Sequence, residues 1–466
     1  MKRIVAALII FILIPLVSCA PDTPPVHEHS FGEWTAVKEA ACLEEGLMER
    51  VCACGEKEIR TVPALGHEVS GAVCVRCGKK ASKGLKYTPG EYFDCYTVTG
   101  IGSCRDADLV IPESFFSKPV TGIDENAFRE LSGIKSVSIP ESVKKIGRYA
   151  FYGCKDLMIL GIPDTVIEAD SCAFSNCTGI VSLRLPLGLI PVGGGTFSGC
   201  TGLKNLIIPE GVKNAGAGMF SGCTGLASVS LPDGIDGGWG FSGCTSLTSV
   251  TFPADAKVIW SGAFAGCVSL TEMKIPEGIT EIGGGAFRRC KGLTSVFIPG
   301  SVTSIGKEAF KECEALESIV VPDSVTVIGD SAFEGCSGLK RAKISGNLTV
   351  IGQRAFVDCS SLEEVTIINS VTRIEARAFR DCKSLKSVVI PDGAEYIGYE
   401  AFFNCGALES VTLGSGLKKI DQRAFYLCKN LKTVRFTGTF EEWQKIEIED
   451  FNSPIRNAEI IFAGQE

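Results

Sequence analysis

The chain has 466 residues, a formal net charge of −8 and 22 cysteines. Its basic and acidic side chains are interspersed rather than gathered into blocks, which argues against a surface for nucleic acid or for anionic lipids. The length allows several ordinary domains, yet cysteines recur at a nearly constant interval between residues 154 and 428. An internal repeat therefore has to be considered before any other fold.

Residues 1–18 have the composition of a secretory signal peptide. Two basic residues precede an apolar run at 4–17, which is too short to remain as a membrane-spanning helix. The run ends in Leu-Val-Ser-Cys, which resembles the lipobox of bacterial lipoproteins. The resemblance implies cleavage before Cys19 and a diacylglycerol on its sulfur, whereas the alternative is ordinary cleavage of a soluble secreted protein. Residues 19–26 contain closely spaced prolines and are expected to form a short, stiff tether.

Residues 27–80 form a small module that holds all three histidines and five cysteines. Cys74-Val-Arg-Cys77-Gly has the spacing of a zinc knuckle, in which two thiolates bind one tetrahedral ion. Three interpretations stay open: a structural zinc, disulfides as expected outside the cytosol, or a plain β module with free thiols. The zinc ligands would be Cys52, Cys54, Cys74 and Cys77, with a histidine able to replace one of them, and the disulfides would also draw on Cys42. The module looks like small Cys-containing modules at the ends of bacterial surface proteins.

From residue 127 to residue 436 a unit of about 23 residues occurs fourteen times, in the form C-x-x-L-x-x-V-x-I-P-x-x-V-x-x-I-G-x-x-A-F-x-x, with Leu131 in place of the first Cys. The aliphatic residues three, six and eight positions after the Cys predict a short strand. A proline then ends the strand in ten of the fourteen units, because it has no N–H to donate. The Gly-x-x-Ala-Phe half predicts one helical or 3₁₀ turn whose Phe points inward.

A single unit cannot bury one Phe, one Leu and three aliphatic residues, so the units are expected to stack into a solenoid of short parallel strands. The repeated Cys is expected to be a small buried hydrophobe whose S–H faces a turn carbonyl. Disulfides would need distortion, because stacked Cβ atoms stay about 4.8 Å apart, and a straight column of thiols offers no tetrahedral metal site. These ladder cysteines are Cys154, Cys177, Cys200, Cys223, Cys244, Cys267, Cys290, Cys313, Cys336, Cys359, Cys382, Cys405 and Cys428.

The A-F-x-x-C-x-x-L-x-x-[VI]-x-I-P phrases of residues 127–436 resemble the BspA-like, treponemal-type leucine-rich repeats of bacterial surface proteins. Residues 84–126 look like the N-terminal cap of such arrays, and residues 437–466 look like their C-terminal cap. The physics requires both caps, because the terminal coils would otherwise expose sheet edges and core. The resemblance implies protein ligands, such as extracellular-matrix proteins.

Catalytic motifs are missing from the sequence. No histidine follows His67, and there is no nucleophile elbow, metalloprotease helix motif, phosphate loop or calcium loop. We therefore expect a protein that is not an enzyme and whose solenoid binds no cofactor. A secreted enzyme would need a cluster of Ser, Asp or Glu that the repeat pattern does not indicate.

The positions four, five and seven residues after each Cys are expected to face solvent in parallel columns. We expect them to form the binding face of an adhesin that is lipid-anchored at the bacterial cell surface or outer membrane and binds a host or neighbouring-cell protein. Its exposed apolar and cationic residues would contribute most, although each could simply be a β-former that supports the sheet. They are Ile207, Lys274, Phe297, Val320 and Lys343. The alternative is a lipoprotein that captures glycans or nutrients, for which paired exposed aromatic residues would be expected.

Overall fold

The computed structural model describes residues 35–41, 44, 46–53, 55–62, 69–70, 73–74, 76, 78–191, 194–212, 216–234, 238, 240–344 and 347–464. The chain divides into two compact units, which are described separately. Unit 1 comprises Met1–Gly240 and Cys244–Pro253, and unit 2 comprises Phe241–Gly243 and Ala254–Glu466. The signal segment, Cys19, Cys42, Cys54, Cys77 and all three histidines lie outside the described residues.

The first strands of unit 1 lie in the segment expected to be a β module. β1 (Thr35–Lys38), β2 (Gly46–Val51) and β3 (Lys57–Val62) form an antiparallel sheet in that order. The two short strands β4 (Val69–Ser70) and β5 (Val73–Cys74) pair with each other in the antiparallel sense.

The rest of unit 1 is a solenoid that opens with a hairpin of β6 (Lys86–Pro89) and β7 (Tyr96–Gly100). Two rows of short parallel strands follow, with orders β17-β15-β13-β11-β8 and β16-β14-β12-β10-β7, and β18 pairs with β19. The strands are β8 (Asp108–Val110), β9 (Ser114–Phe115), β10 (Lys118–Ile123), β11 (Ser136–Ser138), β12 (Lys145–Ile146), β13 (Ile159–Gly161), β14 (Glu168–Ala169), β15 (Ser182–Arg184), β16 (Ile190–Pro191), β17 (Asn205–Ile207), β18 (Ser228–Ser230) and β19 (Ser249–Thr251).

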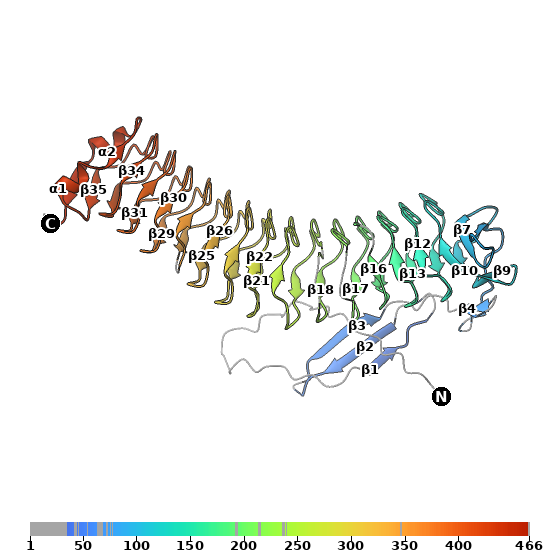
Figure 1. Ribbon diagram of the computed structural model, residues 1–466. Coiled ribbons are helices and arrows are strands. Elements are labelled where there is room, and N and C mark those ends of the chain that lie inside the picture. The colour runs from blue at the N-terminus through green and yellow to red at the C-terminus, as the bar shows by residue number, and fades with distance from the viewer. Residues whose placement is uncertain are drawn as a thin grey trace. The chain divides into compact units, whose positions relative to one another are not determined.

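Unit 2 is a solenoid with the same two rows, which are seen along the yellow-to-red part of the chain in Figure 1. The first row contains β21 (Glu272–Lys274), β23 (Ser295–Phe297), β25 (Ser318–Val321), β27 (Arg341–Ile344), β29 (Glu364–Ile367), β31 (Ser387–Ile390), β33 (Ser410–Leu413) and β35 (Thr433–Phe436). The second row contains β20 (Val258–Ile259), β22 (Glu281–Ile282), β24 (Ser304–Ile305), β26 (Val327–Ile328), β28 (Val350–Ile351), β30 (Arg373–Ile374), β32 (Tyr396–Ile397) and β34 (Lys419–Ile420).

The first row confirms the predicted strand of each repeat. Successive strands pair in parallel, 23 residues apart, as Ser318 does with Arg341 and Ile319 with Ala342. Along β25 the residues alternate between exposed and buried, because successive side chains of a strand point to opposite faces. The second row was not predicted. In it the Ile that recurs in each repeat of unit 2, such as Ile328, is buried while the residue before it faces outward.

The segment from the Gly to the Cys of each repeat, called the turn wall below, is not the predicted helical or 3₁₀ turn. It is a series of β-turns in which Ala309 donates its N–H to Gly306 O at 3.2 Å and Lys311 donates to Glu308 O at 3.1 Å. Glu308 and Glu312 have φ of 58° and 61°, which no helix accommodates. The helix is lost because the wall bonds along the stack instead: Glu312 N–H donates to Glu334 O of the next repeat at 2.7 Å.

The core of each solenoid is a column of stacked phenylalanine rings, one per repeat. In unit 2 the ring centroids of Phe310 and Phe333 lie 5.4 Å apart with an interplanar angle of 1°. In unit 1 Phe151 and Phe174 are 5.1 Å apart with an angle of 5°. All four rings are fully buried, which a single repeat could not achieve. The predicted solenoid fold is therefore confirmed.

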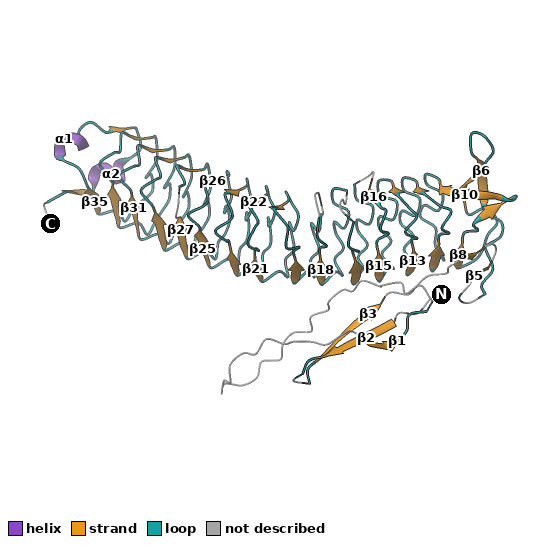
Figure 2. Ribbon diagram, turned by 60° about the horizontal axis from the view of Figure 1, so that its bottom comes forward, coloured by secondary structure: helices purple, strands orange, loops and turns teal. Residues whose placement is uncertain are grey.

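The C-terminal segment of unit 2 continues both rows and then closes them. β36 (Glu447–Ile448) pairs with β34, and β37 (Glu459–Phe462) pairs with β35. Two short helices, α1 (Phe440–Trp443) and α2 (Ser453–Asn457), connect these strands. Figure 2 shows these two helices, which are the only ones among the described residues, in purple at the C-terminal end.

Candidate functional site: the strand face of unit 2

The strand face is the solvent-exposed side of the first strand row of unit 2. Four of the five predicted binding residues lie on it. Phe297 is 53% exposed and Val320 is 56% exposed, and Lys274 and Lys343 are also exposed. The parallel register places Lys274 beside Phe297 and Val320 beside Lys343. A single column thus offers large apolar side chains next to lysines, and Val389, which is 56% exposed, extends it.

The fifth predicted residue, Ile207 in unit 1, does not face solvent. Its exposed fraction is 4%, so the expectation that it belongs to an exposed binding face was wrong. Asn205 and Leu206 of the same strand are buried too, unlike the alternating strands of unit 2. Arg184 is the register partner of Ile207.

A further exposed column, one residue before each strand of the first row, was missed by the sequence analysis. Four positions after successive cysteines, acidic and basic residues alternate without exception over six repeats: Glu317, Lys340, Glu363, Lys386, Glu409 and Lys432. We call this set the charged column. Ion pairs join Lys340 to Glu317 at 3.9 Å, Lys386 to Glu363 at 3.5 Å and Lys432 to Glu409 at 3.7 Å. Every one of the six side chains is more than half exposed. The strict alternation, visible in the sequence, was the available signal.

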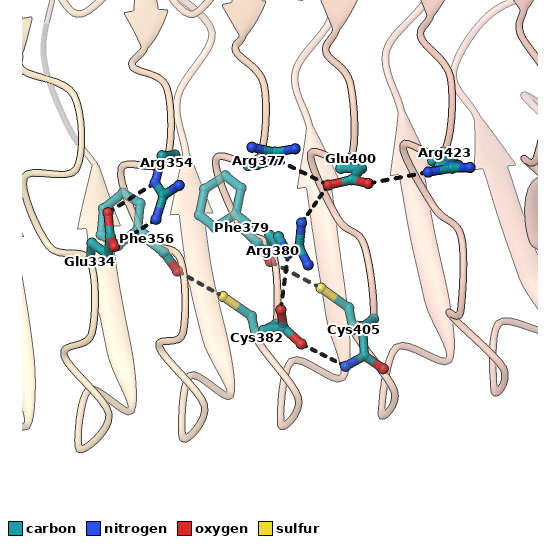
Figure 3. Close-up of polar contacts among 12 residues, drawn as sticks. Glu334, Arg354, Phe356, Arg377, Phe379, Arg380, Cys382, Glu400, Cys405 and Arg423 are labelled. Atoms are coloured by element: carbon teal, nitrogen blue, oxygen red, sulfur yellow. Dashed lines mark hydrogen bonds and ion pairs between the residues drawn. The ribbon is translucent and has the colours of Figure 1, made fainter.

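The ladder cysteines are all buried, and no disulfide links these thirteen residues, which all lie in the described part of the chain. Each S–H faces the carbonyl of a Phe in the preceding repeat, as Cys382 Sγ does with Phe356 O at 3.3 Å and Cys405 Sγ with Phe379 O at 3.3 Å (Figure 3). Burial raises the pKa of the Cys336 thiol to about 12. A neutral, water-excluded thiol is neither a nucleophile nor a metal ligand, so the column has a structural role.

The turn wall of unit 2 contains buried carboxylates that form ion pairs with arginines. Glu400, which is 4% exposed, lies 2.9 Å from Arg377 Nε, 2.5 Å from Arg380 and 3.8 Å from Arg423 (Figure 3). Burial would raise the pKa of Glu400, but hydrogen bonds from Tyr399 and Arg377 and the charges of Arg377 and Arg380 outweigh it and lower the pKa. These pairs join successive repeats and hold the wall together.

Two polar grooves accompany the second strand row. The groove of unit 2 has a volume of about 710 Å³, and its polar lining residues are Thr326, Asp330, Thr349, Gln353 and Glu375. The groove of unit 1 has about 400 Å³ and is lined by residues of β7, β10 and β12. No aromatic side chain lines either groove.

A second exposed surface lies in the cap of unit 1 and was also missed. Tyr92 is 81% exposed, Phe93 is 62% exposed and Phe116 is 77% exposed. Phe93 and Phe116 both have positive φ, at 56° and 45°. A bulky residue in this backbone region is strained, and such strain tends to occur at functional sites. The neighbouring aromatic residues at 92–93 and 115–116 were the signal in the sequence.

The predicted zinc ligands are only partly described. Cys52 is buried and Cys74 ends β5, whereas Cys54 and Cys77 lie outside the described residues. Within the described ranges, no three residues of the types His, Cys, Asp and Glu are grouped so that they could hold a metal ion. The zinc site therefore stays a prediction. No helix in the described part of the chain has the length and apolarity needed to cross a bilayer.

The repeat is matched by a family model. The BspA type leucine rich repeat region matches residues 121–237, 239–363 and 349–461, in six copies. Comparison with curated proteins gave no match.

Several solved structures are similar. A leucine-rich repeat protein from Bacteroides ovatus has 27% identity over 82% of this chain and 98% of its own, with a TM-score of 0.64. A leucine rich cell surface protein of Faecalibacterium prausnitzii has 23% identity over 79% of this chain and 98% of its own, with a TM-score of 0.32. The pneumococcal vaccine antigen PcpA has 19% identity over 82% and 98%, with a TM-score of 0.39. Since the family model matches well over half of the sequence, the chain belongs to the BspA type of leucine-rich repeat proteins.

Proposed function

We propose that this protein is a binding protein that presents the strand face of unit 2 to a protein partner. The observation that carries the proposal is the column of Phe297, Val320 and Val389, three large apolar side chains that are each more than half exposed on a hydrogen-bonded sheet. Exposed apolar residues aligned on a rigid surface are typical of binding sites, and flanking lysines add charge selectivity. The rigid scaffold lowers the entropy lost on binding.

The proposed setting is the bacterial cell surface or outer membrane, with adhesion to a host or neighbouring cell as the role. The signal-like residues 1–18, the lipobox cysteine Cys19 and the proline-rich tether support a lipid anchor. A Cys19→Ser variant tests the anchor: it should leave the membrane fraction and appear as soluble protein. If Cys19→Ser stays in the membrane fraction as the wild type does, the lipid anchor is wrong.

The proposed activity does not include catalysis. The family's architecture supports binding rather than chemistry. The raised pKa of the ladder thiols keeps them protonated at neutral pH. The buried carboxylates of the turn wall, Glu334 and Glu400, form ion pairs with arginines.

The test is a binding screen of the mature chain against extracellular-matrix proteins and glycans, followed by single substitutions. Phe297→Ala and Val320→Ala should each weaken binding to the captured protein about tenfold, which is the usual effect of removing a central interface residue. Val327→Ala is the matched control, because Val327 is 52% exposed but lies on the second row. If the wild type and the three variants bind the captured protein with equal affinity, the strand face is not the binding site.

Glycan capture is the second candidate, and the polar groove of unit 2 favours it. Thr326, Asp330, Gln353 and Glu375 supply the hydroxyl, carboxylate and amide groups that hydrogen-bond to sugars. The absence of aromatic lining counts against it, as does the presence of only one aromatic residue, Phe297, in the strand-face columns. Binding of a glycan that is lost in Gln353→Ala and kept in Phe297→Ala would favour this function.

A structural zinc in residues 27–80 is proposed as the only cofactor. Cys52, Cys54, Cys74 and Cys77 would supply the thiolates. Metal analysis of the purified mature chain should find about one zinc per chain, and Cys74→Ser should lose it. A metal-free wild type whose thiols resist alkylation until a reductant is added would point to disulfides instead.

A further inference from the structure

The charged column of unit 2 has a symmetric charge pattern, which is not needed for the ion pairs within one chain. The residues that lead into neighbouring strands lie directly side by side, since Lys340 N–H donates to Glu317 O at 2.9 Å and Glu363 N–H donates to Lys340 O at 2.9 Å. Alternation prevents repulsion between these neighbours. When an alternating column of six residues is reversed end to end, it carries the opposite charge at every position: Glu-Lys-Glu-Lys-Glu-Lys becomes Lys-Glu-Lys-Glu-Lys-Glu. The column is therefore complementary in charge to a reversed copy of itself.

We propose that the partner of the strand face is a second copy of this chain, bound face to face with its solenoid running in the opposite direction. The twofold axis would lie along the strands, between the repeats of Glu363 and Lys386. Glu363 of one copy then faces Lys386 of the other, Lys340 faces Glu409, and Glu317 faces Lys432. Each pair forms twice, as an isologous contact demands. This inference rests on the proposed function of the strand face and names its partner.

The other columns of the face are compatible with the same axis. Five positions after the cysteines, Arg341 meets Ser410 and Glu364 meets Ser387. Seven positions after them, Lys343 meets Thr412 and Thr366 meets Val389. No pair places like charges together, and at the end of the contact Phe297 meets Ile461 of β37, which is partly exposed.

Alternative placements are disfavoured by the same charges. Sliding one copy by a single repeat puts Glu317 against Glu409 and Lys340 against Lys386, so every contact in the charged column becomes repulsive. A copy that runs in the same direction would place the charged column against the column seven positions after the cysteines. Lys340 would then meet Lys343, and Lys432 would meet Arg435. The charge pattern therefore selects both the direction and the register.

Stacked strands are about 4.8 Å apart, so the charged column is about 24 Å long. Its side chains are more than half exposed, and exposed ion pairs are weak and screened by salt. The contact is therefore expected to be reversible and to weaken as the salt concentration rises. Phe297 and Val320 add apolar area that salt does not screen.

The first experiment is sedimentation of the mature chain, with Cys19→Ser so that no lipid is attached, at about 50 mM and about 500 mM salt. We expect a dimer at low salt and a shift towards monomer at high salt. The variant that combines Lys340→Gln, Lys386→Gln, Lys432→Gln, Glu317→Gln, Glu363→Gln and Glu409→Gln removes all charge from the column without creating repulsion. It should be folded, as judged by circular dichroism, and at least tenfold weaker in dimerisation.

The second experiment uses an exchanged variant in which each Glu of the column becomes Lys and each Lys becomes Glu. This variant keeps every pair of unlike neighbours within the chain, so its fold is not stressed. It should dimerise like the wild type. When differently labelled wild-type and exchanged chains are mixed, however, Glu317 of one would face glutamate at 432 of the other. Mixed dimers should fall well below the half expected for random exchange.

A wild type that is monomeric at low salt up to about 100 µM would overturn the inference, and so would random mixing with the exchanged variant. Either result leaves the proposed function open to its own test. If Phe297→Ala still weakens binding to a different protein, the strand face binds another partner and only the self-association is wrong. If dimers form as described and no other protein binds, the second copy is the partner.

Discussion

The ladder cysteines show how one small residue can serve a stack. Phe287 O accepts the N–H of Cys290 in its own repeat at 3.1 Å and the S–H of Cys313 in the next repeat at 3.2 Å. A larger residue would not fit the fully buried column, and a serine would place a more polar group in it. The thiol is a small hydrophobe that still satisfies a carbonyl.

Thiol ionisation predicts a loss of stability at alkaline pH. Burial raises the pKa of Cys290 and Cys336 to about 12, whereas an unfolded thiol ionises near pH 8.5 to 9. The unfolded chain therefore loses protons that the folded chain retains, and stability falls as the pH rises from about 9 to 12. Each such thiol contributes a slope of about 1.4 kcal/mol per pH unit.

Denaturant unfolding at several pH values between 8 and 11 measures this slope. In the double variant Cys290→Ala with Cys336→Ala, the free energy of unfolding should fall less steeply with pH than in the wild type, by about 3 kcal/mol per pH unit. In the native state at pH 8 a thiol reagent should leave the ladder unlabelled, and it should label the ladder after denaturation. Rapid labelling of the folded ladder, or equal slopes in the two proteins, would contradict this account.

The buried carboxylate Glu334 predicts sensitivity to acid. Burial would raise its pKa, but hydrogen bonds from Arg354, Ser331 and Lys311 outweigh that effect and lower the pKa to about 2. Its stabilising contribution is therefore complete above about pH 4.5 and is lost as the pH falls towards 2. At pH 7, Glu334→Gln should destabilise unit 2 by about 1.5–3 kcal/mol, because Arg354 loses a charged partner that it contacts at 2.8 and 3.1 Å.

Thermal unfolding at pH 7 and pH 3 checks this prediction. The difference in melting temperature between the wild type and Glu334→Gln should be smaller at pH 3 than at pH 7. The matched control is Glu395→Gln. Glu395 also pairs with a lysine, Lys418, at 2.8 Å, but both side chains are more than half exposed. The control should change stability by less than about 1 kcal/mol. A larger loss in the control than in Glu334→Gln would show that the buried network does not stabilise the wall.

Among the elements, the turn wall is the one most dependent on backbone conformation. Two residues per repeat have positive φ, and in several repeats both are glycines, such as Gly262 and Gly266 at 66° and 74°. In others, such as the repeat of Glu308 and Glu312, charged residues take these positions. The strain of an L-residue there is offset by ion pairs along the stack, such as Arg289 with Glu312 at 2.9 Å.

Replacing a glycine of the wall by alanine isolates the backbone term. A Cβ built on Gly262 would have no atom within 4 Å, so Gly262→Ala creates no clash and should still cost about 1–2 kcal/mol for its φ of 66°. Gly300→Ala is the matched control, because its Cβ is equally free and its φ is not positive. The control should be neutral or slightly stabilising. Equal melting temperatures for the two variants would contradict the need for left-handed residues.

For the whole molecule, the decisive question is how a stack of repeats ends. In inner repeats the Phe N–H bonds to the next repeat, as Phe402 does with Ala424 O at 2.7 Å. Phe425 has no further repeat, and Asn452 replaces it: its Oδ1 accepts the Phe425 N–H at 3.0 Å. Asn452 Nδ2 also donates to Asp421 O at 2.8 Å and to Glu449 O at 3.0 Å, while the residue is 1% exposed. One buried amide thus closes the turn wall.

Removing the Asn452 amide should cause local unfolding at the C-terminal end of unit 2. Asn452→Ala leaves the buried Phe425 N–H without an acceptor and should cost about 2–3 kcal/mol. Hydrogen exchange should show the loss first in the last two repeats. Asn430→Ala is the control, because Asn430 also bonds a backbone carbonyl, Gly406 O at 2.7 Å, but is exposed. Unchanged exchange at Phe425 in Asn452→Ala would show that the cap does not depend on this residue.

The period of the sequence predicted the buried columns, because a residue that recurs every 23 positions meets its own equivalents in the core. Phe310, Cys313 and Leu316 were assigned correctly for this reason, and all are fully buried. The turn wall was assigned wrongly, since local helix propensity at Glu308–Cys313 competes with hydrogen bonds to the next repeat. Those bonds are non-local, and no window of a single repeat contains them.

The candidate site was predicted in part. The alternation of the first strand correctly placed Phe297 and Val320 outside, but the same rule failed at Ile207, where both sides of the strand are covered. Burial of a strand's outer side depends on what packs there, and the pattern within the strand carries no information about it. The charged column was visible in the sequence, yet its meaning depended on knowing that Glu317 and Lys340 lie side by side.

The sequence by itself determined that the chain stacks, because its apolar residues have a fixed period and are too numerous for one repeat to bury. It also determined the recurring Phe, Cys and Leu of the core, which are buried in repeat after repeat. Only the tertiary structure decided the second strand row, the turn wall with its residues of positive φ, and the Asn452 amide that ends the stack. Each of these depends on hydrogen bonds between different repeats, such as the one from Glu312 N–H to Glu334 O, 22 positions away. Such bonds exist only once the repeats have packed together.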